Sequence, residues 1–340
     1  MRFGLFQTAQ WPEGTDQHEQ YHNAIEQSVL ADELGYDAVW MTEHHFTRHS
    51  ITSDSLALLS HLAARTERIR LGTAVSVLPF HDPVRLAEST ALVDHLSEGR
   101  LDVGIGRGYQ WSEYHGFGLR LDEGSDRFEE VLDVLLRSWQ ANEPFAHDGK
   151  YFRYDAAFPQ PRPLQQPHPP LWYATGSDAG LRRCAENGWG VMLPQATPPS
   201  TVADTIQRFG TQLQAVGIPS TAGRTVLARG MYCAPTDDEA VDTYVPAYRD
   251  TLQLAAQVSA PPTPVDGGAP RNPFQVDDPS ALRDGIVCGN PDSCAAALQT
   301  LADAGADYVI FFVNLGGMQH DAVMQSLRLF ADEVMPRFAS

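Results

Sequence analysis

The sequence is poor in positive charge and in cysteine. It has 24 lysine and arginine residues against 43 aspartate and glutamate residues, which gives a formal net charge of −19. A protein with this charge repels nucleic acid and anionic membrane surfaces, so we expect neither as a partner. The four cysteines show neither a C-x-x-C spacing nor a metal-ligand spacing. This indicates a reduced, cytoplasmic protein.

Long apolar runs, a leader peptide and the common nucleotide fingerprints are also missing. No apolar stretch approaches the ~20 residues that a membrane span needs, and residues 1–6 resemble a short strand rather than a secretory signal. The pattern G-x-G-x-x-G fails because Tyr109 stands where its third glycine is required, and G-x-x-x-x-G-K-[ST] does not occur. The sequence therefore encodes neither a nicotinamide-binding Rossmann unit nor a nucleotide hydrolase.

What the sequence does contain is a regular alternation of strand-like and helix-like segments. The strand-like segments are eight short apolar runs, which begin near residues 3, 38, 69, 101, 171, 191, 226 and 308. Between them, apolar residues recur with helical period, most clearly from Phe128 to Trp139. Eight strand–helix repeats predict one α/β domain over residues 1–340, a (β/α)₈ TIM barrel. An open doubly wound sheet is the alternative.

Two insertions interrupt this alternation. Residues 141–170 contain seven prolines and precede the fifth strand. Residues 236–289 follow the seventh strand, and their later part, 259–289, is rich in proline and glycine. A loop of this length is usually a lid or a disordered segment. On a barrel it lies on the catalytic face, where we expect it to close over the site.

Ionisable residues follow the second strand at Glu43, His44 and His45. Active sites of barrel enzymes lie at the C-terminal ends of the strands, and adjacent residues of an extended segment point to opposite sides. Only one of the two histidines can therefore face the mouth. A metal site would favour His-x-His, which this chain lacks, so we expect no metal. We favour acid–base chemistry over a histidine that merely closes the barrel rim.

Two strands end in glycine-containing turns, and these turns suggest a bound phosphate. Residues 104–108 read GIGRG and supply Arg107, and Gly176 and Ser177 begin a helix after the fifth strand. Backbone amides and the helix dipole favour an anion at such a point. The alternatives are an arginine that pairs with a surface carboxylate and an ordinary serine N-cap. Because strands four and five are neighbours, Arg107 and Ser177 could converge on one anion.

The third strand carries small residues, which leave room for a flat ligand against the barrel mouth. These residues are Gly72, Thr73 and Ala74. Ordinary packing inside a tapering barrel also favours small side chains, so this pattern alone leaves both interpretations open.

Taken together, three segments resemble the bacterial luciferase family of flavin-dependent oxidoreductases. They are residues 39–47 (VWMTEHHFT), 72–85 and 97–108. The resemblance implies a (β/α)₈ barrel that binds reduced FMN at its C-terminal mouth. On this basis His44 is expected to be the catalytic base, and His45 is expected to support the same region.

The same resemblance implies a set of cofactor-binding residues. Arg107 is expected at the flavin phosphate, with Gly176, Ser177 and Gly180 at the other phosphate-binding turn. The Ala74–Val75 bond is expected to be a non-proline cis peptide against the isoalloxazine ring. The luciferase α subunit has a glutamate and a threonine where this chain has Gly176 and Gly180.

The activity implied by the resemblance is that of a two-component monooxygenase. Reduced FMN from a separate flavin reductase would react with dioxygen to a C4a-peroxyflavin, which oxidises a small organic substrate. A homodimer is also implied. Gly106 replaces the reactive cysteine of the luciferase α subunit, which favours the non-luminous members of the family. The alternatives are a deazaflavin-dependent dehydrogenase, a non-catalytic flavin-binding protein and a metal-dependent hydrolase.

Overall fold

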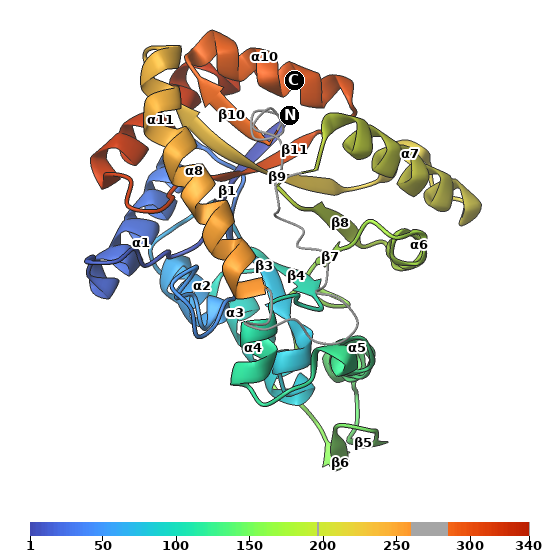
Figure 1. Cartoon of the computed structure of the whole chain (residues 1–340). Coiled ribbons are helices and arrows are strands. Elements are labelled where there is room, and N and C mark those ends of the chain that lie inside the picture. Colours follow the sequence, from blue (N-terminus) through green and yellow to red (C-terminus); the bar gives the residue numbers. More distant parts are fainter. Residues whose placement is uncertain (196, 260–284, 340) are drawn as a thin grey trace.

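A computed structural model describes residues 1–195, 197–259 and 285–339. Within these residues, eight parallel strands close into a barrel that helices surround (Figure 1). Pairing of β11 with β1 and of β8 with β9 closes the ring. This confirms the predicted barrel over the open sheet. In ring order the strands are β1 (Arg2–Gln7), β2 (Ala38–Met41), β3 (Arg70–Val77), β4 (Leu101–Gly106), β7 (Leu171–Ala174), β8 (Gly190–Leu193), β9 (Thr225–Cys233) and β11 (Tyr308–Phe312).

The helices begin and end at residues that the sequence marks. Asp82 caps α3, because its side chain accepts a hydrogen bond from the Arg85 amide at 2.9 Å, and Pro83 opens the helix. Gly35 ends α1 with a φ of +83°. The outer helices are α1 (Gln17–Leu34), α2 (Ser55–Ala63), α3 (Pro83–Leu96), α5 (Gly124–Gln140), α6 (Asp178–Asn187), α7 (Pro199–Ala215), α10 (Pro291–Asp303) and α11 (His320–Glu333). Short 3₁₀ helices are η1 (Leu78–Phe80), η2 (Leu121–Glu123), η3 (Ser220–Ala222) and η4 (Met335–Phe338).

Large aromatic side chains fill the inside of the barrel below its mouth. The rings of Trp40 and Trp172 meet edge to face at 5.5 Å, and the Trp40 indole donates a hydrogen bond to the Tyr308 hydroxyl at 3.0 Å. A Cβ atom at Gly72 would lie 2.3 Å from the Trp40 ring. Gly72 is therefore small because of barrel packing and not because of a ligand. These aromatic rings form the floor below the C-terminal end of the barrel.

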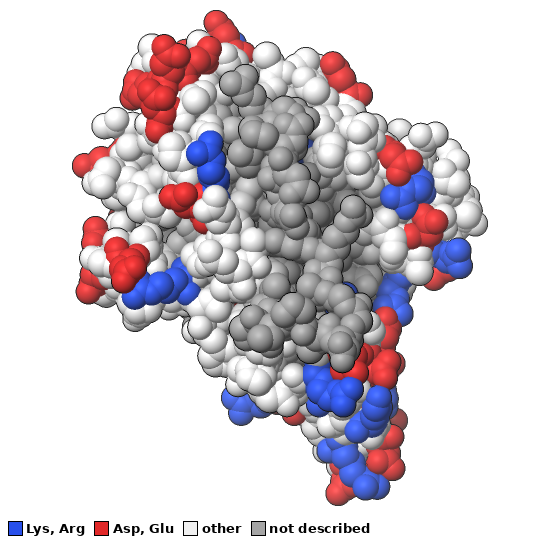
Figure 2. Space-filling view, in the orientation of Figure 1, with Lys and Arg blue, Asp and Glu red and all other residues white. Residues whose placement is uncertain are grey.

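The first insertion contains a β-hairpin that projects away from the barrel. It consists of β5 (Phe145–Asp148) and β6 (Arg153–Ala157) (Figure 1). Figure 2 shows side chains of both charges on the projecting part of the molecule. Ion pairs join Lys150 to Asp126 at 2.8 Å and Arg153 to Asp148 at 3.2 Å.

The second insertion differs from the prediction, because it contains a helix and a strand. After β9 the chain forms α8 (Asp237–Ser259), which reaches α4 (Trp111–Gly116), where the Ser112 hydroxyl donates a hydrogen bond to the Val258 carbonyl at 2.9 Å. Residues 286–289 form strand β10 (Ile286–Gly289), which pairs with β9, so the prediction of a loop there is wrong. The remainder of the predicted loop, residues 260–284, lies outside the described residues. In the part of the chain that the structure covers, no helix is long and apolar enough to cross a membrane.

Candidate active site

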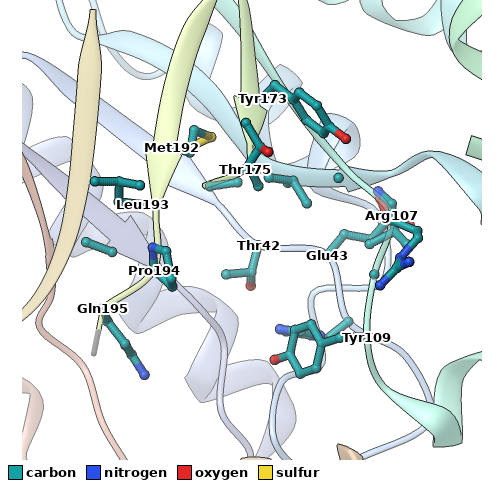
Figure 3. Close-up of a pocket in the computed structure, with 18 of the residues that line it drawn as sticks. Thr42, Glu43, Arg107, Tyr109, Tyr173, Thr175, Met192, Leu193, Pro194 and Gln195 are labelled. Carbon is teal, nitrogen blue, oxygen red and sulfur yellow. The ribbon is translucent and has the colours of Figure 1, made fainter. Parts of the chain in front are cut away.

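A cavity of about 580 Å³ opens at the C-terminal mouth of the barrel (Figure 3). This volume lies in the range that is usual for small-molecule sites, which are concave and mostly apolar. Every barrel strand or the residues directly after it contribute to the wall. One contributor from each strand is Thr8, His44, Val75, Arg107, Thr175, Gln195, Ala228 and Phe312.

Part of the cavity wall is apolar and is formed around the third strand. Ala74 and Val75 line the cavity, and the bond between them is cis, as the resemblance implied. Met192 and Leu193 of β8 line it as well (Figure 3). A Cβ atom at Gly106 would lie 2.5 Å from a methyl group of Val75. The Val75 side chain therefore leaves no room for a side chain at position 106.

Arg107 and Gly176 line the same cavity from neighbouring strands. The Arg107 guanidinium donates a hydrogen bond to the Ser125 hydroxyl at 2.9 Å, and Ser125 lies in the first turn of α5. Among the described residues Arg107 forms no ion pair with a carboxylate. Apart from its two chain neighbours, no described residue has an atom within 4 Å of a Cβ atom placed on Gly176, so this side of the turn is open among the described residues. The structure thus brings a cation and the start of the α6 turn to one cavity.

Ser177 and Gly180 do not line the cavity. The Ser177 hydroxyl accepts a hydrogen bond from the Gly180 amide at 3.2 Å and caps α6, which is the N-cap alternative raised by the sequence. A Cβ atom at Gly180 would lie 2.0 Å from the Thr175 hydroxyl oxygen. Gly180 therefore gives space to Thr175, and Thr175 supplies the side-chain hydroxyl that reaches the cavity wall at this turn.

His44 lines the cavity and is oriented by Glu113 of α4. Its Nδ1 atom lies 2.8 Å from a Glu113 carboxylate oxygen, and the Glu113 side chain is 1% exposed. An ionised carboxylate only accepts hydrogen bonds, so we assign the proton of a neutral His44 to Nδ1. The Nε2 atom is then the one that can accept a proton. This arrangement suits a general base held in one tautomer.

His45 points away from the cavity. Its Nε2 atom lies 3.1 Å from a Glu43 carboxylate oxygen, and its ring packs edge to face against Phe117 at 4.7 Å. Its backbone amide donates a hydrogen bond to Glu113 at 3.0 Å. Of the two adjacent histidines only His44 faces the mouth, as the alternation of an extended chain predicts.

Glu43 is a buried carboxylate in the cavity wall and is bound on several sides. It lies 2.8 Å from Nε2 of His81, and it accepts a hydrogen bond from the Val77 amide at 3.0 Å. Burial by itself raises the pKa of Glu43, but His81, His45 and the Val77 amide outweigh burial and lower this pKa to about 2. Burial lowers the pKa of His81, and the facing Glu43 overcomes this and raises it. The two groups therefore form an ion pair in which Glu43 is buried and His81 is partly exposed.

Comparison with known proteins now identifies the family. The family model described as luciferase-like monooxygenase matches residues 1–308. The chain belongs to the luciferase-like monooxygenase family. Its relatives include the oxygenase component of the flavin-dependent trigonelline monooxygenase of Acinetobacter baylyi, which is 28% identical over 100% of this chain and 96% of the relative. An uncharacterized protein of Sinorhizobium fredii, y4vJ, is 39% identical over 50% of this chain and 48% of that protein.

Solved structures of the luciferase-like fold superpose over the full length. The monooxygenase RslO1 from Streptomyces bottropensis matches with a TM-score of 0.89 at 28% identity, and the match covers 100% of both chains. An F420-dependent secondary alcohol dehydrogenase in complex with an F420–acetone adduct matches with a TM-score of 0.78 at 17% identity, over 100% of this chain and 99% of that chain. The second likeness shows the fold alone.

Several groups of the luciferase-like cavity were not predicted from the sequence. Glu113 and Ser125 both line the cavity, but neither belongs to a recognisable sequence motif. Both lie several residues after the fourth strand, so their positions along the chain did not mark them as site residues. Thr175 directly precedes the predicted turn at Gly176, and a search for hydroxyls on either side of that turn would have found it. Within the described ranges, no three His, Cys, Asp or Glu side chains gather as a metal site.

Replacement of Glu43 by glutamine is expected to destabilise this luciferase-like barrel by about 3 kcal/mol near pH 6, because a pKa lowered from 4.5 to about 2 corresponds to that free energy. The Glu43 contribution is present above pH 4.5 and is lost as the pH falls through about 2. The His81 contribution is present below pH 6.5 and is lost as the pH rises through its raised pKa. Urea unfolding at pH 6 and pH 9 measures the loss, which should be smaller at pH 9.

A matched control is Glu26→Gln, which removes the carboxylate of a partly exposed pair with Arg65. Its effect should stay within about 1 kcal/mol at both pH values. If Glu43→Gln lost the same stability at pH 6 and pH 9, the ion pair between Glu43 and His81 would not be the cause.

Proposed function

We propose that this protein is the oxygenase of a two-component monooxygenase that uses reduced FMN and dioxygen to oxidise a small organic substrate. One observation carries the proposal. A guanidinium suited to a phosphate, Arg107, and a carboxylate-held histidine, His44, line one apolar cavity at the barrel mouth. The family and the name of the full-length relative, a flavin-dependent oxygenase component, support it.

The cavity suits a flavin mononucleotide. Arg107, Ser125, Thr175 and the amide of Gly176 would hold the phosphate, since they supply a cation, two hydroxyls and an N–H group. The Ala74–Val75 peptide would lie against the ring system. When bound, reduced FMN would supply the electrons that activate dioxygen. The open space beside Gly176 leaves room for the phosphate oxygens. Ser177 would support this turn without touching the phosphate, because its hydroxyl caps α6 and its amide donates a hydrogen bond to the Thr175 hydroxyl at 3.4 Å.

The chain itself has two tasks in this reaction. The apolar wall keeps water away, so that transfer of oxygen competes with its loss as hydrogen peroxide. His44 moves a proton at Nε2 while Glu113 holds the ring by accepting the hydrogen bond of Nδ1. One oxygen atom would enter the substrate and the other would leave as water. Residues 260–284 of the predicted lid lie outside the described part of the chain, and no step is assigned to them.

Two partners belong to the proposal. A separate flavin reductase would supply reduced FMN, because the sequence has no nicotinamide fingerprint. We also propose a homodimer, with α3 in its interface, because Leu92 and Leu96 of this helix are 50% and 53% exposed. Sedimentation of the wild type and of a Leu92→Lys, Leu96→Lys variant would test the homodimer.

Anaerobic titration with reduced FMN tests the function, with F420 titrated in parallel. We expect reduced FMN to saturate the protein at one molecule per chain, followed by incorporation of ¹⁸O from labelled dioxygen into an organic product. Tight binding of F420 without FMN binding would favour a deazaflavin-dependent dehydrogenase instead. Flavin binding with no labelled product across a broad substrate set would favour a non-catalytic flavin-binding protein.

A further inference from the structure

The side of the cavity formed by β1 carries a buried hydroxyl group that the proposed flavin site does not use. Phe6 and Thr8 both line the cavity, while Gln7 between them donates a hydrogen bond outward to Gln27 at 3.2 Å. Thr8 is 2% exposed, and its hydroxyl oxygen has no hydrogen-bond partner among the described residues. Because a buried hydroxyl without a partner costs about 1–3 kcal/mol, this group is suited to a ligand.

His49 lies at the same part of the rim as Thr8. The Trp11 amide donates to the Arg48 carbonyl at 3.1 Å, and the Ile51 amide donates to the Ala9 carbonyl at 2.7 Å. These two bonds join the segment after β1 to the segment that contains His49. His49 lines the cavity, and its ring packs edge to face on His44 with 4.7 Å between centroids.

The hydrogen bonding of His49 makes it a donor toward the cavity. The Gln110 side-chain nitrogen, a donor, lies 3.4 Å from Nδ1 of His49 and 3.2 Å from Nδ1 of His44. Because Nδ1 of His44 donates to Glu113, we assign the Gln110 hydrogen bond to Nδ1 of His49. Burial, followed by the nearby His44, lowers the pKa of His49 to about 3, so the imidazole is neutral at ordinary pH. With Nδ1 as the acceptor, the ring proton lies on Nε2. The His49 N–H and the Thr8 hydroxyl are thus two donors at one rim.

This rim lies across the barrel from the proposed phosphate site. In the closed ring, three strands separate β1 from β7 on either side, and β7 leads to Thr175 and Gly176. Molecules held near Thr8 and His49 therefore occupy a different part of the cavity from the flavin phosphate.

The charges near this rim favour a neutral molecule. Arg107 is the one arginine or lysine among the described lining residues, and it belongs to the phosphate side. Glu43 is bound to His81 and His45, and Glu113 is bound to His44. A carboxylate placed at the rim would thus find no cation of its own. A cation would find both carboxylates already bound. The nearby wall is apolar and includes Phe6, Ile310 and Phe312.

We propose that Thr8 and His49 form a substrate subsite that binds the acceptor oxygen of a neutral, largely apolar organic molecule beside His44. This inference rests on the proposed function. The Thr8 hydroxyl and the His49 N–H donate to the two lone pairs of one oxygen, and the apolar wall holds the hydrocarbon part. The subsite orients the substrate between the flavin and the base, and it selects against anions and pure hydrocarbons.

Three probes of similar shape test the subsite on the FMN-loaded protein: cyclohexanone, methylenecyclohexane and cyclohexanecarboxylate. Ligand-observed NMR titration gives their dissociation constants. The wild type should bind the ketone more tightly than the alkene and the carboxylate. Thr8→Val should weaken ketone binding by about 2- to 10-fold, the effect of one hydrogen bond, and leave alkene binding unchanged. His49→Phe should act in the same direction.

The control variants are Thr8→Ser, which keeps the hydroxyl and should keep the preference for the ketone, and Thr90→Val, whose hydroxyl bonds the α3 backbone at Leu86, at 2.7 Å. A ketone no tighter than the alkene, or equal ketone binding by wild type and Thr8→Val, would overturn the subsite even if FMN binding and oxygen incorporation are normal. If FMN fails to bind but the ketone preference persists without it, the proposed function fails and the subsite stands.

Discussion

Replacement of His44 by alanine is expected to lower the rate of product formation by about 10²–10⁴-fold, the usual contribution of a general acid or base. The loss follows from the contact with Glu113 at 2.8 Å, which keeps the proton of the neutral ring on Nδ1 and leaves Nε2 toward the cavity. Single-turnover mixing of the reduced FMN complex with oxygen and substrate measures the rate. Binding of reduced FMN should change by less than about threefold, because His44 does not lie at the phosphate side.

Two further variants separate chemistry from structure. Glu113→Gln should give an intermediate loss, because an amide oxygen accepts the hydrogen bond of Nδ1 less strongly than a carboxylate and holds the His44 ring less firmly. His45→Ala should reduce the rate less than His44→Ala, since the His45 ring packs against Phe117 and not in the cavity. Equal product yields from the wild type and His44→Ala would remove His44 as the base.

Replacement of Arg107 by alanine is expected to weaken binding of reduced FMN by about 10- to 100-fold. A guanidinium–phosphate contact is a charge-assisted hydrogen bond, worth about 1.5–3 kcal/mol, and Arg107 is the one arginine or lysine among the described lining residues. Anaerobic titration that follows flavin fluorescence gives the dissociation constant. Arg107→Lys should recover part of the affinity, because lysine keeps the charge but not the planar fork.

The sharpest control for Arg107 is a change of ligand. Riboflavin lacks the phosphate, so its affinity should be the same for the wild type and Arg107→Ala. Arg120→Ala, which removes an exposed arginine beside Asp122, should leave FMN binding unchanged. An equal loss of riboflavin and FMN affinity in Arg107→Ala would mean that Arg107 supports the cavity wall and does not hold the phosphate.

The barrel could be predicted from the sequence because each strand–helix unit carries its own pattern. Helix α5 follows the stripe from Phe128 to Trp139, and α3 begins at the predicted cap, Asp82. Helix α8 and strand β10 were not predicted, since they lie at the two ends of a stretch whose prolines and glycines suggested a loop. Pro246 inside α8 further obscured its helical pattern.

The sequence by itself determined that ionisable and glycine-rich segments meet at one end of a barrel, because the order of strands and the period-2 alternation are local properties. It also determined that one of the adjacent histidines faces inward. The family resemblance pointed to His44, and the tertiary structure supplies the physical reason, because Glu113, 69 residues further along the chain, contacts its ring. The structure likewise shows that Ser177 caps α6 and that Thr175 lines the cavity. Contacts of this kind form only when the barrel closes, and no spacing along the chain encodes them.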